Sequence, residues 1–219
     1  MEILVRELDI NKTKKSFKRV VWFYNFWSWL TESKAAKVVI GLAGIKDGAN
    51  ILEVACGTGV VFERIVSRNP NGMNIGIDLS TDMLNKAGKR LKKSTGNFKL
   101  QEGNVLNLDF KDSTFDIVIN NFMVDLMPVE TFDKIAQEFH RVLKPHGIVV
   151  ISTFSFGTKK INRLWLWLAK HFPGLLTGCR PVSFKEYLIK SGFDIEEDLE
   201  ITQNTFPSEV IKAKKPHID

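Results

Sequence analysis

The sequence predicts an α/β fold: a doubly wound, mostly parallel sheet of seven strands with an antiparallel last strand and an N-terminal helical lid. Short apolar runs of strand length alternate along the chain with longer stretches in which apolar residues recur at helical spacing. A glycine-rich turn follows the first apolar run, as in sheets that bind ligands at the carboxyl ends of their strands. No repeat or composition shift marks a second compact domain. We therefore expect a lid at residues 1–45 and one domain at residues 46–219.

Composition and charge exclude several classes of protein. The chain has 219 residues, of which 44% are hydrophobic and 26% charged, as is ordinary for a globular protein. It contains neither an apolar run of membrane-spanning length nor a signal-peptide pattern at its start, so we expect a cytoplasmic location. The two cysteines and four scattered histidines have no metal-ligand spacing, and we expect no metal. The net charge of +6 is a mild basic excess, and runs of basic residues such as these usually lie on solvated helix faces or tails. We therefore do not expect nucleic acid as the partner.

The elements before the first strand are helical. Residues 17–30 follow a lysine-rich start and are dense in aromatic side chains. Residues 31–43 continue as a second helical stretch, because Ala35, Val38, Val39 and Leu42 recur on one side. This part of the chain accounts for the expected lid.

The first strand and its turn, ILEVACGTG at residues 51–59, form the most informative segment. A continuous apolar run is typical of a buried parallel strand. Gly57 and Gly59 allow a tight turn that brings backbone N–H groups against a ligand at the start of the helix from Val60. The segment predicts a site for a nucleoside-containing cofactor.

The remaining elements follow in regular alternation. The Asn69–Gly72 cluster ends the helix from Val60, and Ser80 or Thr81 caps the next helix. Residues 132–143 have the spacing of an amphipathic helix, closed by a turn at residues 144–147. A further helical stretch covers residues 161–172. The expected strands span residues 50–55, 74–78, 98–102, 115–120, 147–153, 193–202 and 208–213.

The charge around the turn distinguishes between two kinds of cofactor. A dinucleotide fingerprint requires a small residue where this chain has Phe62, so the match to NAD binding is incomplete. Glu53, at the strand end, would repel a pyrophosphate but attract an ammonium group. Asp78 ends the second strand, where an acid accepts hydrogen bonds from ribose hydroxyls. A nucleoside cofactor with an amino-acid end fits this pattern best.

The order ExxCGTG, GIDLS, EGNV, FDIVI and RVLKPHG resembles the class I S-adenosylmethionine-dependent methyltransferases over residues 50–153. The resemblance implies a Rossmann-like methyltransferase fold and S-adenosylmethionine as cofactor. It implies that Glu53 and the glycine turn hold the methionine end, that Asp78 holds the ribose, and that the remaining residues enclose the adenine or contact the methionine. The implied cofactor-binding residues are Glu53, Ala55, Gly57, Thr58, Gly59, Asp78, Leu79, Met83, Asn104, Val105 and Asn120.

Two positions depart from the family pattern. Ala55 replaces the usual first glycine, and we expect it to fit if its φ is negative. Asn104 replaces a common aspartate, and its carbonyl oxygen still accepts a hydrogen bond from an adenine amino group. A plain turn role for Asn104 is the alternative.

The acceptor side offers one titratable candidate. Asp125 is the only such residue in the segment 120–128 after the fourth strand, which topology places beside the methyl group. We expect it to act as catalytic base or to orient the acceptor, against a purely structural role at a helix start. The Asn/Asp-Pro-Pro-aromatic signature of nucleic-acid amino methyltransferases is absent, as is a nucleophilic cysteine.

Aromatic side chains indicate a lipophilic acceptor. Residues 20–29 combine many aromatic rings with nearby lysines, which suits either a packed lid or a peripheral contact at a membrane surface. The opening YNFWS resembles the ubiquinone and menaquinone biosynthesis methyltransferases, which methylate a polyprenylated ring. By that resemblance, Tyr24 and Trp27 lie over the cofactor and acceptor, while Arg180 is expected to pair with an oxygen-rich group.

The predicted function is thus methyl transfer to a small, lipophilic acceptor such as a quinone precursor. A phospholipid N-methyltransferase of the phosphatidylethanolamine type is the alternative within the family. An NAD-dependent oxidoreductase and a basic RNA-binding protein are the alternatives from other classes.

Overall fold

The computed structural model describes residues 33–158, 162–171 and 179–217 of the chain. Seven strands form one sheet in the order β3-β2-β1-β4-β5-β7-β6. Neighbouring strands from β3 to β5 pair in parallel, and β7 pairs antiparallel with both β5 and β6. The strands are β1 (Asn50–Val54), β2 (Met73–Asp78), β3 (Phe98–Glu102), β4 (Phe115–Asn121), β5 (Leu143–Phe154), β6 (Asp194–Gln203) and β7 (Phe206–Lys214). The predicted α/β class and antiparallel last strand are confirmed.

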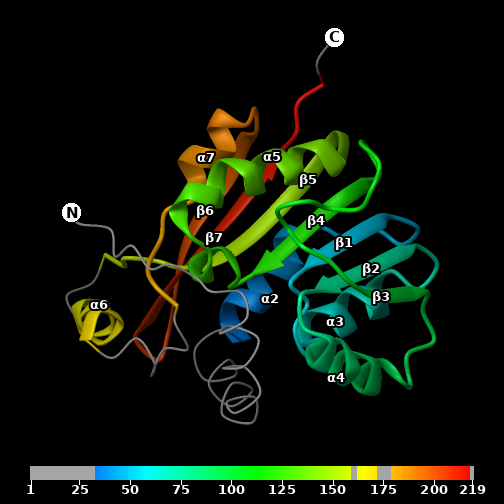
Figure 1. Cartoon of the computed structure of the whole chain (residues 1–219), viewed down its shortest axis with the longest axis horizontal. Coiled ribbons are helices and arrows are strands. Elements are labelled where there is room, and N and C mark those ends of the chain that lie inside the picture. Colours follow the sequence, from blue (N-terminus) through cyan, green and yellow to red (C-terminus); the bar gives the residue numbers. More distant parts are fainter. Residues whose placement is uncertain (1–32, 159–161, 172–178, 218–219) are drawn as a thin grey trace.

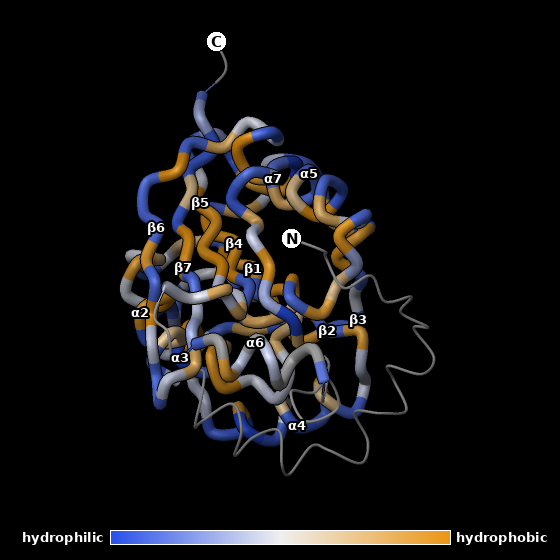
Figure 2. Tube along the Cα trace, turned by 90° about the vertical axis from the view of Figure 1, so that its left-hand side faces the viewer, coloured by the Kyte–Doolittle hydropathy of each residue, from blue (hydrophilic) through white to orange (hydrophobic). Residues whose placement is uncertain are grey.

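Helices cover both faces of the sheet (Figure 1). One face carries α2, α3 and α4, and the opposite face carries α5 and α7. The helices are α2 (Ser33–Leu42), α3 (Val60–Arg68), α4 (Thr81–Leu91), α5 (Phe132–Val142), α6 (Asn162–His171) and α7 (Lys185–Lys190), with two 3-10 turns, η1 (Val124–Leu126) and η2 (Val129–Thr131). Two apolar clusters, one on each side of the sheet, form the core, and Figure 2 shows the apolar central strands between more polar outer segments.

Local sequence explains several boundaries. The Ser80 hydroxyl accepts from the Met83 N–H at 3.4 Å and caps α4, as predicted. Amphipathic α5 buries Ile135, Ala136 and Phe139 completely against the sheet. α2 buries Ala35 and Val39 against the sheet. The helix described within residues 1–45 therefore packs directly on one face of the sheet. The rest of the expected lid, residues 1–32, lies outside the described residues.

The turn predicted at residues 144–147 is instead the start of β5. Leu143 already pairs with Phe115 of β4, and the register then shifts before Ile117. The backbone of this segment finds a second partner, since the His146 N–H donates to the Lys215 carbonyl at 2.9 Å. Pairing with a distant segment, invisible to local turn signals, therefore extends the strand by four residues beyond the predicted start.

A loop rather than a helix connects β3 to β4. Arg141 of α5 holds it by donating to the carbonyl oxygens of Leu108 at 2.8 Å and Phe110 at 2.7 Å. Glu138 accepts from the Leu108 N–H at 2.7 Å and also from Arg141. These bonds fasten residues 103–114 over the face of the sheet that α5 covers.

Candidate functional site

The glycine turn after β1 adopts a backbone that glycine favours. Gly57 has φ of 54° and Gly59 has φ of 79°, both in the left-handed region. A Cβ on Gly59 would lie 3.0 Å from the Cβ of Ala87, so glycine is also needed for the close approach of α4. The Thr58 carbonyl accepts from Arg90 Nε of α4 at 2.9 Å, which fixes the turn from that side. The turn is therefore rigidly placed at the carboxyl end of β1.

Ala55 corrects one expectation, because its φ is +59° rather than negative. An L-residue in this region has its Cβ close to the carbonyl oxygen, at a cost of about 1–2 kcal/mol. The Cys56 N–H nevertheless donates to the Ile77 carbonyl at 2.9 Å and ties the turn to β2. A left-handed backbone, which glycine adopts without strain, is adopted here by an alanine.

Glu53 lies buried beside this turn. Its side chain is only 2% exposed, and its Oε2 atom has no hydrogen-bond partner among the described residues. Burial, and then the negative charge of Asp78, raise the pKa of Glu53 well above its usual value. A cationic group bound here would both satisfy this oxygen and favour the carboxylate.

Asp78 is anchored by backbone N–H groups. One carboxylate oxygen accepts from Gly57 at 2.9 Å and the other from Ser80 at 2.9 Å. Burial raises the pKa of Asp78, while these two hydrogen bonds lower it. Each carboxylate oxygen has more than one acceptor direction, so the residue is held in place and still accepts from a hydroxyl.

The structure adds Asn121, which the sequence reasoning missed. The side-chain amide of Asn121 lowers the pKa of Glu53. Its Nδ2 atom nevertheless has no partner at hydrogen-bond geometry among the described residues. The Asn121 Oδ1 accepts from Ser152 of β5 at 2.7 Å. Glu53, Asn121 and Ser152 thus form a polar row across β1, β4 and β5. Period-two alternation along β4 could have indicated this residue, because neighbouring residues of a strand point to opposite faces.

Asn120 therefore points away from Glu53. Its Nδ2 donates to the Val54 carbonyl at 2.9 Å, and its Oδ1 has no partner among the described residues. It is fully buried at the end of β4. The residue is available as an acceptor on the α5 side of the strand ends.

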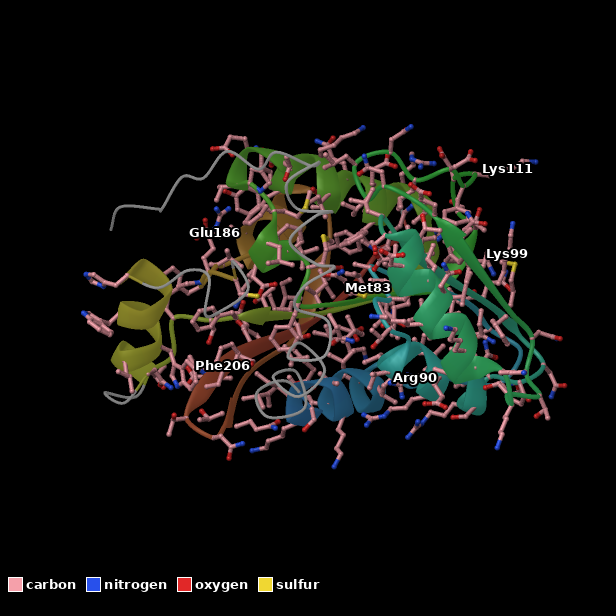
Figure 3. The ribbon with its side chains drawn as sticks, turned by 60° about the horizontal axis from the view of Figure 1, so that its bottom comes forward. Met83, Arg90, Lys99, Lys111, Glu186 and Phe206 are labelled. Atoms are coloured by element: carbon pink, nitrogen blue, oxygen red, sulfur yellow. The ribbon has the colours of Figure 1, made fainter. Side chains whose placement is uncertain are left out.

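The residues expected around the adenine gather beside Asp78. Met83 is 4% exposed and extends from the first turn of α4 toward the interior (Figure 3). Leu79 is half-buried, and Val105 is 5% exposed. The Gly103 N–H donates to the Asp78 carbonyl at 3.1 Å, which brings residues 103–105 to the end of β2. Asn104 closes its own turn, since Oδ1 accepts from the Leu106 N–H at 3.0 Å.

Asp125 and Arg180 lie together on the acceptor side. Asp125 in η1 is fully buried, and the Arg180 N–H donates to its backbone carbonyl at 3.3 Å. Burial raises the pKa of Asp125 to about 7, against the lowering influence of Cys179, the Phe154 backbone and Arg180. Arg180 also donates to the Met127 carbonyl. The two residues predicted for the acceptor are thus neighbours, and Asp125 faces protein groups rather than solvent.

Some expectations stay predictions. Tyr24 and Trp27 lie outside the described residues. Within the described ranges, no group of three or more histidine, cysteine, aspartate or glutamate side chains is arranged to hold a metal. Cys56 is buried against α3 with its pKa raised by burial, which suits a space-filling thiol. No helix in the part of the chain that is described is long and apolar enough to span a membrane.

Comparison with known proteins shows similarity to methyltransferases. Residues 51–147 match the methyltransferase domain family. A demethylmenaquinone methyltransferase of Staphylococcus aureus is 38% identical over 145 residues, or 65% of this chain and 56% of that protein. Over these residues the chain carries a methyltransferase domain, and the findings together support a class I S-adenosylmethionine-dependent methyltransferase.

Other similar proteins agree with this assignment. A 2-phytyl-1,4-naphtoquinone methyltransferase of Nostoc is 32% identical over 151 residues, covering 66% of this chain and 65% of that protein. The matches thus span less than two thirds of these relatives' lengths. A solved structure described as a putative methyltransferase of Bacillus halodurans superposes with a TM-score of 0.69 at 17% identity, over 83% of this chain and 99% of that one. This last likeness concerns the fold alone.

The residues present fit S-adenosylmethionine, the cofactor of the family. The Glu53 oxygen that has no partner among the described residues offers an acceptor to an α-ammonium group, and a Cβ added at Gly57 would meet nothing within 4 Å, so the turn leaves room for the methionine end. Asp78 and Met83 lie where a ribose and an adenine would follow. A diphosphate would instead place negative charge against a buried carboxylate.

Proposed function

We propose that this protein transfers a methyl group from S-adenosylmethionine to a small, lipophilic acceptor of the quinone-precursor type. The observation that carries the proposal is the buried, unsatisfied carboxylate of Glu53 beside the glycine turn. The acceptor class is supported by the two relatives named for quinone methylation.

In this proposal the cofactor supplies an electrophilic methyl group, and the protein mainly aligns and shields the reactants. Glu53, Ala55, Gly57, Thr58 and Gly59 hold the amino-acid end. Leu79 and Met83 flank the adenine, Asn104 and the Val105 N–H contact its edge, and Asp78 holds the ribose. Asn120 approaches the methionine from β4.

Asp125 is the proposed group that accepts a proton from the acceptor or orients it. A carboxyl group with a pKa of about 7 is suited to proton transfer near neutral pH. Arg180, which touches the Asp125 backbone, is the proposed partner for an acceptor oxygen. Tyr24 and Trp27 are proposed to cover the acceptor from the N-terminal segment.

We also place the protein in the cytoplasm with a peripheral contact at the membrane surface. A polyprenylated acceptor partitions into the bilayer, and the aromatic and basic residues before position 33 suit the interface between lipid and water. The finding that no described helix spans a membrane agrees with a contact of this kind.

The test is methyl transfer from radiolabelled S-adenosylmethionine to three acceptors in detergent: a demethylated prenyl naphthoquinol, phosphatidylethanolamine and a water-soluble quinol. We expect the prenylated ring to be methylated fastest. Preferred methylation of phosphatidylethanolamine would replace the acceptor class with the phospholipid amine. No transfer to any of them, with cofactor still bound, would refute the lipophilic-ring assignment.

A further inference from the structure

Helix α6 is divided between a side held by the protein and a side that is left exposed. It follows β5 and lies outside the two layers of helices, beside the tips of β6 and β7 (Figure 1). The Trp165 indole N–H donates to the Thr205 hydroxyl at 3.0 Å, and the ring packs edge-on against Phe206. The Asn162 amide donates to the Thr205 carbonyl at 2.9 Å. These contacts fasten one side of α6 to the turn of the β6–β7 hairpin.

The opposite side of the helix exposes large apolar side chains. Leu164 is 50% exposed and Trp167 is 49% exposed. Their spacing of three residues places them on one face of the helix, and Trp167 stacks on His171 one turn further. Phe156, shortly before the helix, is 36% exposed. This outer face of α6 exposes more leucine and tryptophan than is usual for a surface that contacts only water.

The stretch of sequence that contains the helix carries charged residues of a single sign. Residues 156–180 contain five lysine and arginine residues and neither aspartate nor glutamate. Two of these, Arg163 and Lys170, belong to the sequence of α6. Tryptophan and leucine next to basic residues match the boundary of a bilayer that contains anionic lipids.

Acidic residues of β6 lie near α6, and most of them are paired. Strand β6 carries several carboxylates, but Lys185 pairs with Asp198 at 2.7 Å and Lys212 pairs with Glu196 at 2.9 Å. Glu200, the nearest of these acids to α6 along the hairpin, accepts from the Thr158 hydroxyl at 3.0 Å. These partners reduce the negative charge that β6 presents beside α6.

We infer that the outer face of α6, centred on Leu164 and Trp167, docks on the surface of an anionic lipid bilayer. The inference deepens the proposed function, because the chain leaves β5 at Phe154, forms α6 and returns at residues 180–182 over Asp125. The Val182 N–H donates to the Phe154 carbonyl at 3.0 Å and closes this excursion. A membrane contact at α6 thus lies on the segment that borders the acceptor side.

The test uses spin labels on the full-length chain. Leu164→Cys carries the label on α6, and Ile189→Cys on α7 is the matched control, since Ile189 is 52% exposed. Both native cysteines are buried, which directs the label to the introduced residue. With vesicles of phosphatidylcholine and phosphatidylglycerol, the label at position 164 should lose access to an aqueous nickel chelate and gain access to oxygen. The label at position 189 should not change.

A water-exposed label at position 164 on vesicle-bound protein would overturn the inference, even if the N-terminal segment binds lipid. Trp167→Glu gives a second measurement: vesicle binding should fall by about tenfold or more, because burying a large apolar side chain contributes about 1.5–3 kcal/mol. Ile189→Glu should leave binding unchanged. Equal binding by all variants, or binding to RNA in place of vesicles, would also overturn it. Methyl transfer in detergent measures the proposed function separately and does not depend on this contact.

Discussion

At the scale of single residues, Asp125 links stability to pH. Its pKa is raised to about 7 by burial, so the folded chain keeps a proton that the unfolded chain releases at lower pH. Stability should therefore fall as the pH rises from about 4 to 7 and stay constant above that. Asp125→Asn should remove this loss and raise the free energy of unfolding at pH 8 by a few kcal/mol.

Urea unfolding between pH 4 and 8 measures this effect. Glu209 has its pKa raised to about 7 by burial as well, so Glu209→Gln should remove a separate part of the same slope. Parallel curves for wild type and Asp125→Asn over the whole range would contradict this, because they would show that the pKa of Asp125 does not rise on folding.

The same residue should govern catalysis. If Asp125 accepts a proton, the wild-type kcat should rise with pH through about 7, and Asp125→Asn should lower kcat by about 100-fold or more and abolish that rise. A steady-state pH profile with the prenylated acceptor measures this. A variant that keeps the wild-type profile while KM rises would make Asp125 an acceptor-orienting residue instead.

Ala55 stores strain that glycine would release. Ala55→Gly should raise the free energy of unfolding by about 0.5–1 kcal/mol, because the left-handed backbone penalises a Cβ more than glycine loses in chain entropy. Ala49, whose φ is not positive, provides the control: Ala49→Gly should cost about 0.5–1 kcal/mol. Thermal unfolding of both variants decides the matter, and a loss for Ala55→Gly would contradict the strain assigned to the turn.

At the scale of elements, α5 fastens the loop between β3 and β4 through a single guanidinium group. Arg141→Met should cost about 2–4 kcal/mol, because it leaves Glu138, which is 4% exposed, without its main partner and frees two carbonyl oxygens. Arg141 also lowers the pKa of Glu138, so the wild type gains stability as the pH rises through that depressed pKa, and the variant should gain less.

Lys134→Met is the matched control for this element. Lys134 lies 3.8 Å from the same Glu138 but from an exposed position, so its loss should cost less than about 0.5 kcal/mol. Denaturant titration at neutral and acidic pH compares the two variants. Equal costs would mean that the loop does not depend on the bonds of Arg141.

The elements show what local sequence predicts and what it does not. The Ser80 cap, strand β3 and helix α5 were predictable, because capping hydroxyls, apolar runs and helical periodicity act over a few residues. The early start of β5 was not, since it depends on pairing with Phe115 and Lys215. Asn121 was not predicted as a site residue, because its role depends on which face of β4 it occupies.

At the scale of the whole molecule, one topology brings distant residues to one edge. Parallel strands β1, β2 and β4 end together, so Glu53, Asp78 and Asn120 lie at the same edge of the sheet although the sequence separates them, with Asn120 on the opposite face from Glu53. That these residues share one edge was predictable from the order of motifs, whereas the neighbourhood of Asp125 and Arg180 depends on the long connection through α6. The residues proposed for the cofactor and those proposed for the acceptor thus lie in differently built parts of the fold.

The central claim is that buried Glu53 selects a cofactor with a cationic amino-acid end. Titration calorimetry of S-adenosylhomocysteine and NAD against wild type, Glu53→Gln and the surface control Glu63→Gln measures it most directly. We predict that S-adenosylhomocysteine binds and NAD does not, that Glu53→Gln weakens binding by about 10-fold or more, and that Glu63→Gln does not. Binding of NAD by the wild type, or unchanged binding of S-adenosylhomocysteine by Glu53→Gln, would contradict the claim.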